Sequence, residues 1–353
     1  MKRKKKNPGS KATVWLIVTA LALAGGALLY VYGGRYIYDH RRSNFLARTE
    51  VYVLPGDSAE AVLSRVTPFA KDARSLSRAF RSEGVFESGV QPGRYLIEPA
   101  LTSTYVARMF SHGWQSEAAI TLSGSIRTRG TLAKRISSKM MIDSTAVADA
   151  LKDNSFLAAY GTDTTGVFSL FIPDTYSILW TASVEDIFAR FKKEYDAWWT
   201  SERKAKAEAA GLSPYEVSVL ASIVDGETKY QPEMARIAGV YLNRLKRGML
   251  LQADPTVAYC FGYSINRVLK KHLEVNSPYN TYKFKGLPPG PISVPPKACL
   301  EAVLNAEKHS YIYFCASPEL NGTHRFATNL SEHNANAVMY QRALTAWQKK
   351  NKK

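Results

Sequence analysis

The sequence predicts an α+β protein with a single N-terminal helix that anchors it in a membrane. Residues 12–34 carry no charged side chain, and a stretch of this length spans a bilayer. Residues 48–115 show strand, helix, helix and strand patterns in that order, which is typical of a small module with one sheet and a helical back. Residues 161–348 alternate longer helical patterns with proline-rich loops, which indicates a larger mixed α+β domain.

The N-terminal segment sets the expected topology. Residues 1–11 contain six basic residues and no acid, so we expect this end to stay in the cytoplasm. The chain after Gly34 would then lie outside the inner membrane, in the periplasm. Ala22-Leu23-Ala24 resembles a signal-peptidase site, which leaves a cleaved signal peptide as the alternative. Because the apolar stretch continues past this tripeptide, an uncleaved anchor is favoured.

The charge and cysteine content narrow the class of partner only in part. The net charge is +17, and without the six basic residues of the first segment it is 17 − 6 = +11. Nucleic acid, membrane headgroups and anionic cell-wall polymer would all attract such a body, and charge does not choose among them.

Cys260, Cys299 and Cys315 show no C-x-x-C pair and no histidine at zinc-ligand spacing, which argues against a metal site. Burial as small apolar side chains is favoured over a disulfide.

The remaining elements follow from local signals. Residues 35–47 are polar and basic and are predicted to connect the membrane anchor to the module. The module should contain strands at 51–54 and 95–97, a helix capped by Ser58, and helices at 72–81 and 105–110. Residues 116–160 are predicted as a connecting subdomain with a strand at 118–122 and a helix at 132–141. A helix follows at 184–199, and residues 349–353 form a solvated tail.

The most informative helix begins at Ser213. Pro214 takes the first helical position and Glu216 completes a capping box, so the register of the helix is defined. Its apolar face carries Leu220, Ile223 and Val224 and continues to Glu227.

A carboxylate that continues an apolar face should be partly desolvated. Desolvation raises its pKa and lets it hold a proton near neutral pH, as a general acid must. Asp225 lies about 200° around the helix from Glu227 and should point away from that face. The alternative for Glu227 is an ion pair with an arginine or fraying at the helix end, because Gly226 weakens the last turn.

Polar loops follow the next helix, which runs from Pro232 to Leu245 and closes at Gly248. Segments 252–256, 276–282 and 286–292 combine rigid prolines with amide, hydroxyl and aromatic side chains, which suits a groove for a polar polymer. Ordinary surface turns are the alternative for any one of them. His324 and His333 lie in a polar cluster before the last helix and lack a third metal ligand at suitable spacing, so His333 is expected to form hydrogen bonds or to place a charge at the helix end.

Several motifs in a consistent order resemble the YceG-like (MltG) family of endolytic murein transglycosylases. They are Ala221-Ser222-Ile223-Val224 with Glu227-Thr228, and the segments 240–245, 251–257, 279–282, 286–292 and 328–334. The resemblance covers residues 165–345 well and residues 48–115 more loosely, where the family has a LysM-like module. Two positions depart from the family pattern: Asp225 stands where a glutamate is usual, and Leu122-Ser123-Gly124 lacks the acidic residue that usually precedes the glycine.

The resemblance implies a cut between N-acetylmuramic acid (MurNAc) and N-acetylglucosamine (GlcNAc) inside peptidoglycan strands. Glu227 would protonate the leaving oxygen and then accept the proton of the C6 hydroxyl, which attacks C1 and leaves a 1,6-anhydroMurNAc end without water. Such a cut would terminate the elongation of nascent strands. Peptidoglycan strands, the inner membrane and peptidoglycan synthases are the expected partners, and neither a metal, another cofactor nor nucleic acid is implied.

The expected site consists of Glu227 as the catalytic residue and a set of substrate-binding residues. The set is Gln252, Asp254, Thr256, Tyr279, Asn280, Tyr282, Asn329 and His333. We expect at least three of Gln252, Asp254, Tyr279, Asn280 and Asn329 to lie in one groove with Glu227, although Asp254 is equally well explained as the start of an Asp-Pro turn. Two other functions stay open: a non-catalytic membrane-anchored scaffold that binds peptidoglycan, and a hydrolytic muramidase that pairs Glu227 with Asp254 or Asp225.

Overall fold

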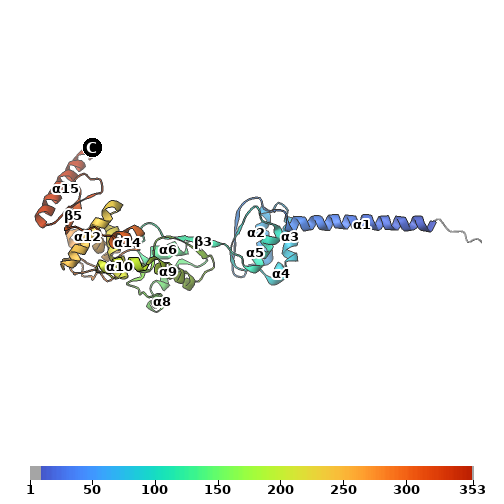
Figure 1. Ribbon diagram of the computed structural model, residues 1–353, viewed down its shortest axis with the longest axis horizontal. Helices are drawn as coiled ribbons and strands as arrows, with labels where there is room; N and C mark the ends of the chain where they lie inside the picture. Colours follow the sequence, from blue (N-terminus) through green and yellow to red (C-terminus); the bar gives the residue numbers. More distant parts are fainter. Residues whose placement is uncertain (1–8, 352–353) are drawn as a thin grey trace, which may run out of the picture. The chain divides into compact units, whose positions relative to one another are not determined.

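The computed structural model describes residues 9–351, which form two compact units (Figure 1). The first unit reaches Ala118 and includes residues 179–181, and the second contains residues 119–178 and the chain from Ala182 onward. Most of the predicted basic segment, residues 1–8, and the last two residues, 352–353, lie outside the described residues. Helices and strands occur in both units, which confirms the predicted α+β class.

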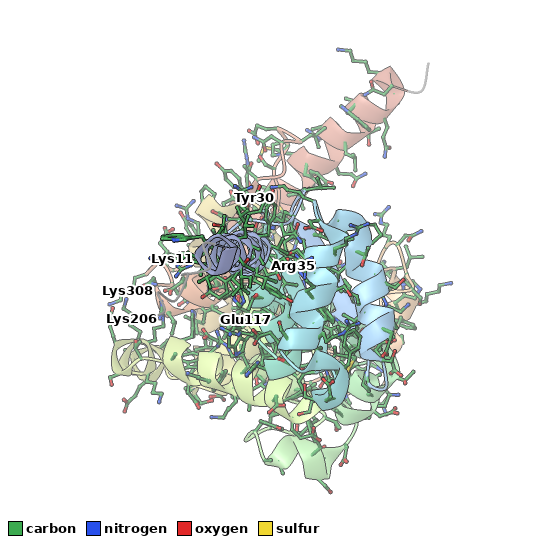
Figure 2. All side chains as sticks on the ribbon, turned by 90° about the vertical axis from the view of Figure 1, so that its right-hand side faces the viewer. Lys11, Tyr30, Arg35, Glu117, Lys206 and Lys308 are labelled. Carbon is green, nitrogen blue, oxygen red and sulfur yellow. The ribbon has the colours of Figure 1, made fainter. Side chains whose placement is uncertain are left out.

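Helix α1 (Gly9–His40) is long and apolar enough to cross a membrane. Figure 2 looks along this helix and shows its side chains, among them Tyr30 and Arg35, on all sides. Tyr30 is 84% exposed, and no residue of the most apolar window is buried. Because nothing in the described chain covers this apolar surface, the helix is suited to a lipid environment.

Helix α1 continues six residues beyond the predicted span, so part of the predicted connector 35–47 is helical. Its last turn is bound to the first unit, because Asp39 accepts hydrogen bonds from the Ser75 hydroxyl at 2.6 Å and from Arg78 Nη2 at 2.7 Å. Phe45, also in the predicted connector, is fully buried in the core of the unit. The predicted connector is therefore partly folded, because some of its residues contact the first unit.

The rest of the first unit has the predicted order of strands and helices. Strands β1 (Thr49–Val53) and β2 (Gly93–Ile97) pair antiparallel, with Val51 opposite Tyr95. The helices are α2 (Ala59–Val66), η1 (Thr67–Phe69), α3 (Ala73–Ser82), α4 (Val85–Ser88) and α5 (Ser103–His112). The Ser58 side chain accepts from Ala61 N and caps α2, as predicted. The inward faces of the strands and helices meet in one core that includes Phe80 and Phe110.

The second unit is larger and mainly helical. Strands β3 (Glu117–Thr121) and β4 (Thr175–Leu179) pair with each other, and most of their residues belong to this unit. Strands β5 (Tyr313–Ala316) and β6 (His324–Ala327) form an antiparallel hairpin that was not predicted. Its first helices are α6 (Arg129–Ser137), α7 (Ser144–Ala150), α8 (Asn154–Ala158), η2 (Val167–Leu170), α9 (Val184–Trp198) and α10 (Ser201–Ala209). They are followed by α11 (Pro214–Glu227), α12 (Gln231–Lys246), α13 (Asp254–Cys260), η3 (Lys270–Glu274), α14 (Lys297–Leu304) and α15 (Leu330–Lys350), and the predicted tail begins inside α15.

Helix α11 is the centre of the second unit, packed against α12, α13 and α14. Its predicted start is confirmed: Ser213 and Glu216 form a reciprocal capping box, and Pro214 is the first helical residue. The expectation that Asp225 points away from the core is wrong, since only 4% of it is exposed. Every residue from Val217 to Asp225 is buried, because neighbouring helices surround α11. A helix without a solvent face cannot be oriented by an apolar stripe alone.

Candidate active site

Glu227 is the last residue of α11, where the chain turns into an extended conformation at Thr228. Its Oε1 accepts a hydrogen bond of 2.6 Å from the hydroxyl of Tyr241, which is buried in α12. Burial raises the pKa of Glu227 to about 7; the negative charge of Asp254 also raises it, while the Tyr241 hydrogen bond and Arg244 oppose the rise. Near neutral pH such a carboxyl group can both give and accept a proton.

Gly226 explains how a second carboxylate comes close to Glu227. A Cβ atom at this position would lie 2.4 Å from Cβ of Pro255, so only glycine allows α13 to begin against the end of α11. Asp254 is the first residue of α13, and its Oδ1 accepts a hydrogen bond of 2.7 Å from the Tyr282 hydroxyl. The glycine therefore serves a close approach between two helices.

Three pockets of the second unit share Glu227. The central pocket, of about 250 Å³, is lined by Glu227, Tyr241, Arg244, Leu251, Gln252, Asp254, Tyr282, Phe314, Cys315, Ala316 and His324. The arginine pocket, of about 380 Å³, adds Arg127 and Arg267, and shares Asp254 with the central pocket. The aromatic pocket, of about 630 Å³, adds Tyr230, Tyr340 and Trp347, and shares His324 with the central pocket. Glu227 is the one residue that lines all three of these pockets.

Three of the predicted substrate-binding residues line the central pocket: Gln252, Asp254 and Tyr282. The backbone of Gln252 has a φ of +50°, a conformation that a residue with a side chain rarely adopts. Its side-chain oxygen lies 3.3 Å from Nη1 of Arg244, and its backbone N–H donates to the carbonyl of Thr281. These contacts hold Gln252 in place at the wall of the pocket.

Two predicted residues, Thr256 of α13 and Asn280 of a loop, are fully buried and donate hydrogen bonds to nearby backbone carbonyls. The Thr256 hydroxyl donates to the carbonyl of Ala253 at 2.7 Å. The Asn280 amide donates to the carbonyls of Leu273 and Val275, both at 2.8 Å. Neither residue lines any of the three pockets at Glu227. Their polar side-chain groups therefore stabilise the local fold.

The other three predicted residues also lie outside these pockets. Tyr279 packs on Tyr259 with ring centroids 4.6 Å apart. Asn329 caps α15 by accepting a hydrogen bond of 2.9 Å from a backbone N–H. His333 stacks on Tyr313, and burial lowers the pKa of its ring. Of the five residues expected in one groove, Gln252 and Asp254 line it and the other three do not.

Sequence reasoning missed a buried pair beside Glu227. Glu233 of α12 is 7% exposed and accepts from the backbone N–H of His324 at 3.1 Å, while its second oxygen lies 2.9 Å from His324 Nδ1. The imidazole lines both the central and the aromatic pocket. The partners lie 91 positions apart in the sequence, and the local signal is no more than a histidine in a polar cluster.

Asp225 and the three cysteines are the remaining reactive side chains that the sequence singled out. Asp225 forms an ion pair with Lys229 and lines the arginine pocket. Cys260, Cys299 and Cys315 are unpaired. Within residues 9–351, no three histidine, cysteine or carboxylate side chains converge as metal ligands would. The pockets are lined by carboxyl, imidazole, hydroxyl, thiol, guanidinium and ammonium groups.

Several known proteins are similar to this chain. Residues 51–339 match the model of the YceG-like family. The endolytic murein transglycosylase of Bacillus subtilis (strain 168) is 29% identical over 331 residues, which cover 88% of this chain and 89% of that protein. The endolytic murein transglycosylase of Streptococcus pneumoniae (strain D39) is 30% identical over 175 residues, 47% of this chain and 31% of that protein. A crystal structure of a YceG-like protein from Listeria monocytogenes superposes with a TM-score of 0.54 at 26% identity, covering 82% of this chain and 98% of that chain.

Proposed function

This chain belongs to the YceG-like family, and on that premise we propose that Glu227 is the acid and base with which it cleaves peptidoglycan. Like the relatives named above, it is an endolytic murein transglycosylase. The observation that supports the role of Glu227 is its position where three pockets meet, with a pKa of about 7. A group with this pKa is available as an acid for the first proton transfer and as a base for the second.

The proposed reaction needs one proton and no water. Protonated Glu227 gives its proton to the glycosidic oxygen of GlcNAc while the bond from this oxygen to C1 of MurNAc breaks. The C6 hydroxyl of the same MurNAc forms the new bond to C1, and its proton passes to the Glu227 carboxylate. The enzyme returns to its starting state and the strand carries a 1,6-anhydroMurNAc end. Attack within one sugar has a high effective concentration, which can replace activation of a water molecule.

Two neighbours support this role through Glu227. The Tyr241 hydroxyl fixes one carboxyl oxygen and leaves the other for the sugar. Asp254, held by Tyr282, places a negative charge beside the carbon that becomes electron-poor when the glycosidic bond breaks.

The position of Asp254 in the same pocket as Glu227 is the one observation that supports hydrolysis instead. A second carboxylate in the same pocket is what a muramidase uses as nucleophile or to activate water. The products distinguish the two reactions, because hydrolysis leaves reducing MurNAc ends and transglycosylation leaves anhydro ends.

We infer a substrate contact for His324. Both oxygens of Glu233 accept hydrogen bonds from this residue, so Nδ1 of the ring carries a proton. No hydrogen bond to Nε2 of this ring is present in the described part of the chain. Because the ring lines the central and aromatic pockets, Nε2 is available for a hydrogen bond with a sugar hydroxyl or acetamido group.

The anchor suggests where the reaction takes place. Helix α1 is compatible with a single membrane crossing. We propose that it crosses the inner membrane with the N-terminus in the cytoplasm, which places the second unit in the periplasm. There it would cut strands as they are made and end their elongation, with peptidoglycan synthases as neighbours. Protease added to spheroplasts should degrade the chain after about residue 48, and protection of the whole chain would contradict this orientation.

The decisive experiment for catalysis compares the parent with Glu227→Gln. Purified full-length protein in detergent is incubated with sacculi, and the products are identified by mass spectrometry. We expect anhydro ends from the parent and at least a hundredfold loss in the variant, because acid and base catalysis contributes about 10² to 10⁴. Glu208→Gln, a change of an exposed carboxylate on α10, is the matched control. Activity of Glu227→Gln within tenfold of the parent would disprove the assignment.

A further inference from the structure

The arginine pocket holds two guanidinium groups without carboxylate partners. Arg127 and Arg267 form no ion pair with any of residues 9–351. Some arginines of the second unit form such pairs, namely Arg190, Arg203, Arg236 and Arg325, whereas others, such as Arg135 and Arg247, do not. The two unpaired cations therefore lie together in a pocket that Glu227 also lines.

The position of Arg127 is fixed from two directions. Its guanidinium carbon lies 4.9 Å from the ring centroid of Tyr263. Tyr263 has a φ of +58°, and its hydroxyl donates to the carbonyl of Ile292 at 2.7 Å. On the other side, the carbonyl of buried Ile126 accepts from the backbone N–H of Val294 at 2.9 Å. A tyrosine held in a rarely adopted conformation beneath a cation, next to a catalytic group, indicates a preformed binding site.

The pocket already contains three carboxylates, and each of them has another partner. Asp225 is paired with Lys229. Asp254 accepts a hydrogen bond from Tyr282, and Glu227 accepts one from Tyr241. The guanidinium groups are therefore available to an external anion. Arginine binds carboxylates through two parallel hydrogen bonds, which gives such a site geometric selectivity.

We propose that the arginine pocket binds a carboxylate on the side group of muramic acid and thereby places the correct one of two alternating glycosidic bonds at Glu227. The inference rests on the proposed function. GlcNAc is neutral, whereas the lactyl group of MurNAc ends either in its own carboxylate or in a stem peptide that bears carboxylates. Because the arginine and central pockets share Glu227 and Asp254, the bound group belongs to a sugar close to the bond that is cut.

The test measures binding by full-length Glu227→Gln protein in detergent, with or without a second change, Arg127→Gln or Arg267→Gln. Three ligands separate the sources of charge: strands with stem peptides, strands stripped by an amidase that carry only lactyl carboxylates, and neutral GlcNAc oligomers. Lys308→Gln is the matched control, because Lys308 is exposed, lies outside the three pockets and carries the same charge (labelled in Figure 2).

We expect each arginine change to raise the Kd at least tenfold for carboxylate-bearing strands and less than twofold for GlcNAc oligomers. An effect confined to stem-bearing strands identifies the stem carboxylates, and one confined to stripped strands identifies the lactyl carboxylate. Equal weakening of all three ligands, or of none, overturns the proposal. Unchanged melting temperatures show that the variants fold, and Arg267→Gln, in an exposed loop, tests the pocket if Arg127→Gln does not. Absence of anhydro products from the parent would instead refute the proposed function.

Discussion

Replacing Glu227 by glutamine should abolish cleavage and, at alkaline pH, stabilise the protein. The folded protein binds a proton on Glu227 more tightly than the unfolded chain does, since its pKa is raised from 4.5 to about 7. Stability therefore decreases as pH rises through this window and levels off above it. The pKa difference is 7 − 4.5 = 2.5, and at about 1.4 kcal/mol for each pH unit it corresponds to a loss of about 3 kcal/mol at pH 8.

Glutamine has the shape of the protonated carboxyl group and never carries the buried charge. Its oxygen can still accept the hydrogen bond of Tyr241. The variant should consequently exceed the parent in stability by about 3 kcal/mol at pH 8 and by less than about 1 kcal/mol at pH 5. For a unit of this size, 1 kcal/mol corresponds to about 2 to 4 °C in melting temperature.

The assay is thermal unfolding of full-length parent and variant in the same detergent at pH 5 and pH 8. We expect a gain of several degrees at pH 8 that shrinks at pH 5, while exposed Glu208→Gln follows the parent at both values. A Glu227→Gln protein that is no more stable than the parent at pH 8, or that gains equally at both pH values, would refute the idea that Glu227 carries a desolvated charge. A group kept for chemistry at a cost in stability is expected at an active site.

Three further changes test the parts around Glu227. Tyr241→Phe removes a hydrogen bond that lowers the pKa of Glu227, so the alkaline limb of the rate against pH should move up by about 1 to 2 pH units; an unmoved limb would contradict the contact. Gly226→Ala places a methyl group against Pro255, so it should slow cleavage at least tenfold and lower the free energy of unfolding by about 1 to 3 kcal/mol. An alanine at the unobstructed Gly130 should have neither effect. His324→Asn keeps a donor toward its buried carboxylate partner but removes Nε2, so kcat/KM should fall at least tenfold without a change in Tm, and His324→Gln should recover part of it. Parent-like rates in the asparagine variant would leave His324 with a structural role only.

Local signals predicted the framework of the site. The capping box at Ser213 and Glu216 is formed by residues three apart, so the start and register of α11 could be read from the sequence. The position of Glu227 followed from this register. The same reasoning failed for Asp225, because the number of helices packed around α11 decides whether it has an exposed face, and no short segment contains that information.

The wall of the groove was less predictable. Polar residues in turn-rich segments can bind a ligand or their own backbone, and composition does not distinguish the two. Asn280 bonds its own loop, whereas Tyr282, two residues later, faces the pocket. Tyr241 and His324 are placed by contacts between distant segments, so their roles became visible only from the assembled fold.

The bidentate contact of Asp39 with Arg78 has a mechanical consequence for the anchor. Because α1 ends within the first unit, no loose stalk separates the apolar span from the folded module. The six residues from Arg35 to His40 rise only about 9 Å along a helix, at 1.5 Å for each residue. With α1 in a bilayer, the first unit is held close to the lipid surface by a continuous helix and not by a flexible linker. Its distance from the headgroups is thereby set by the length of the helix beyond the apolar span.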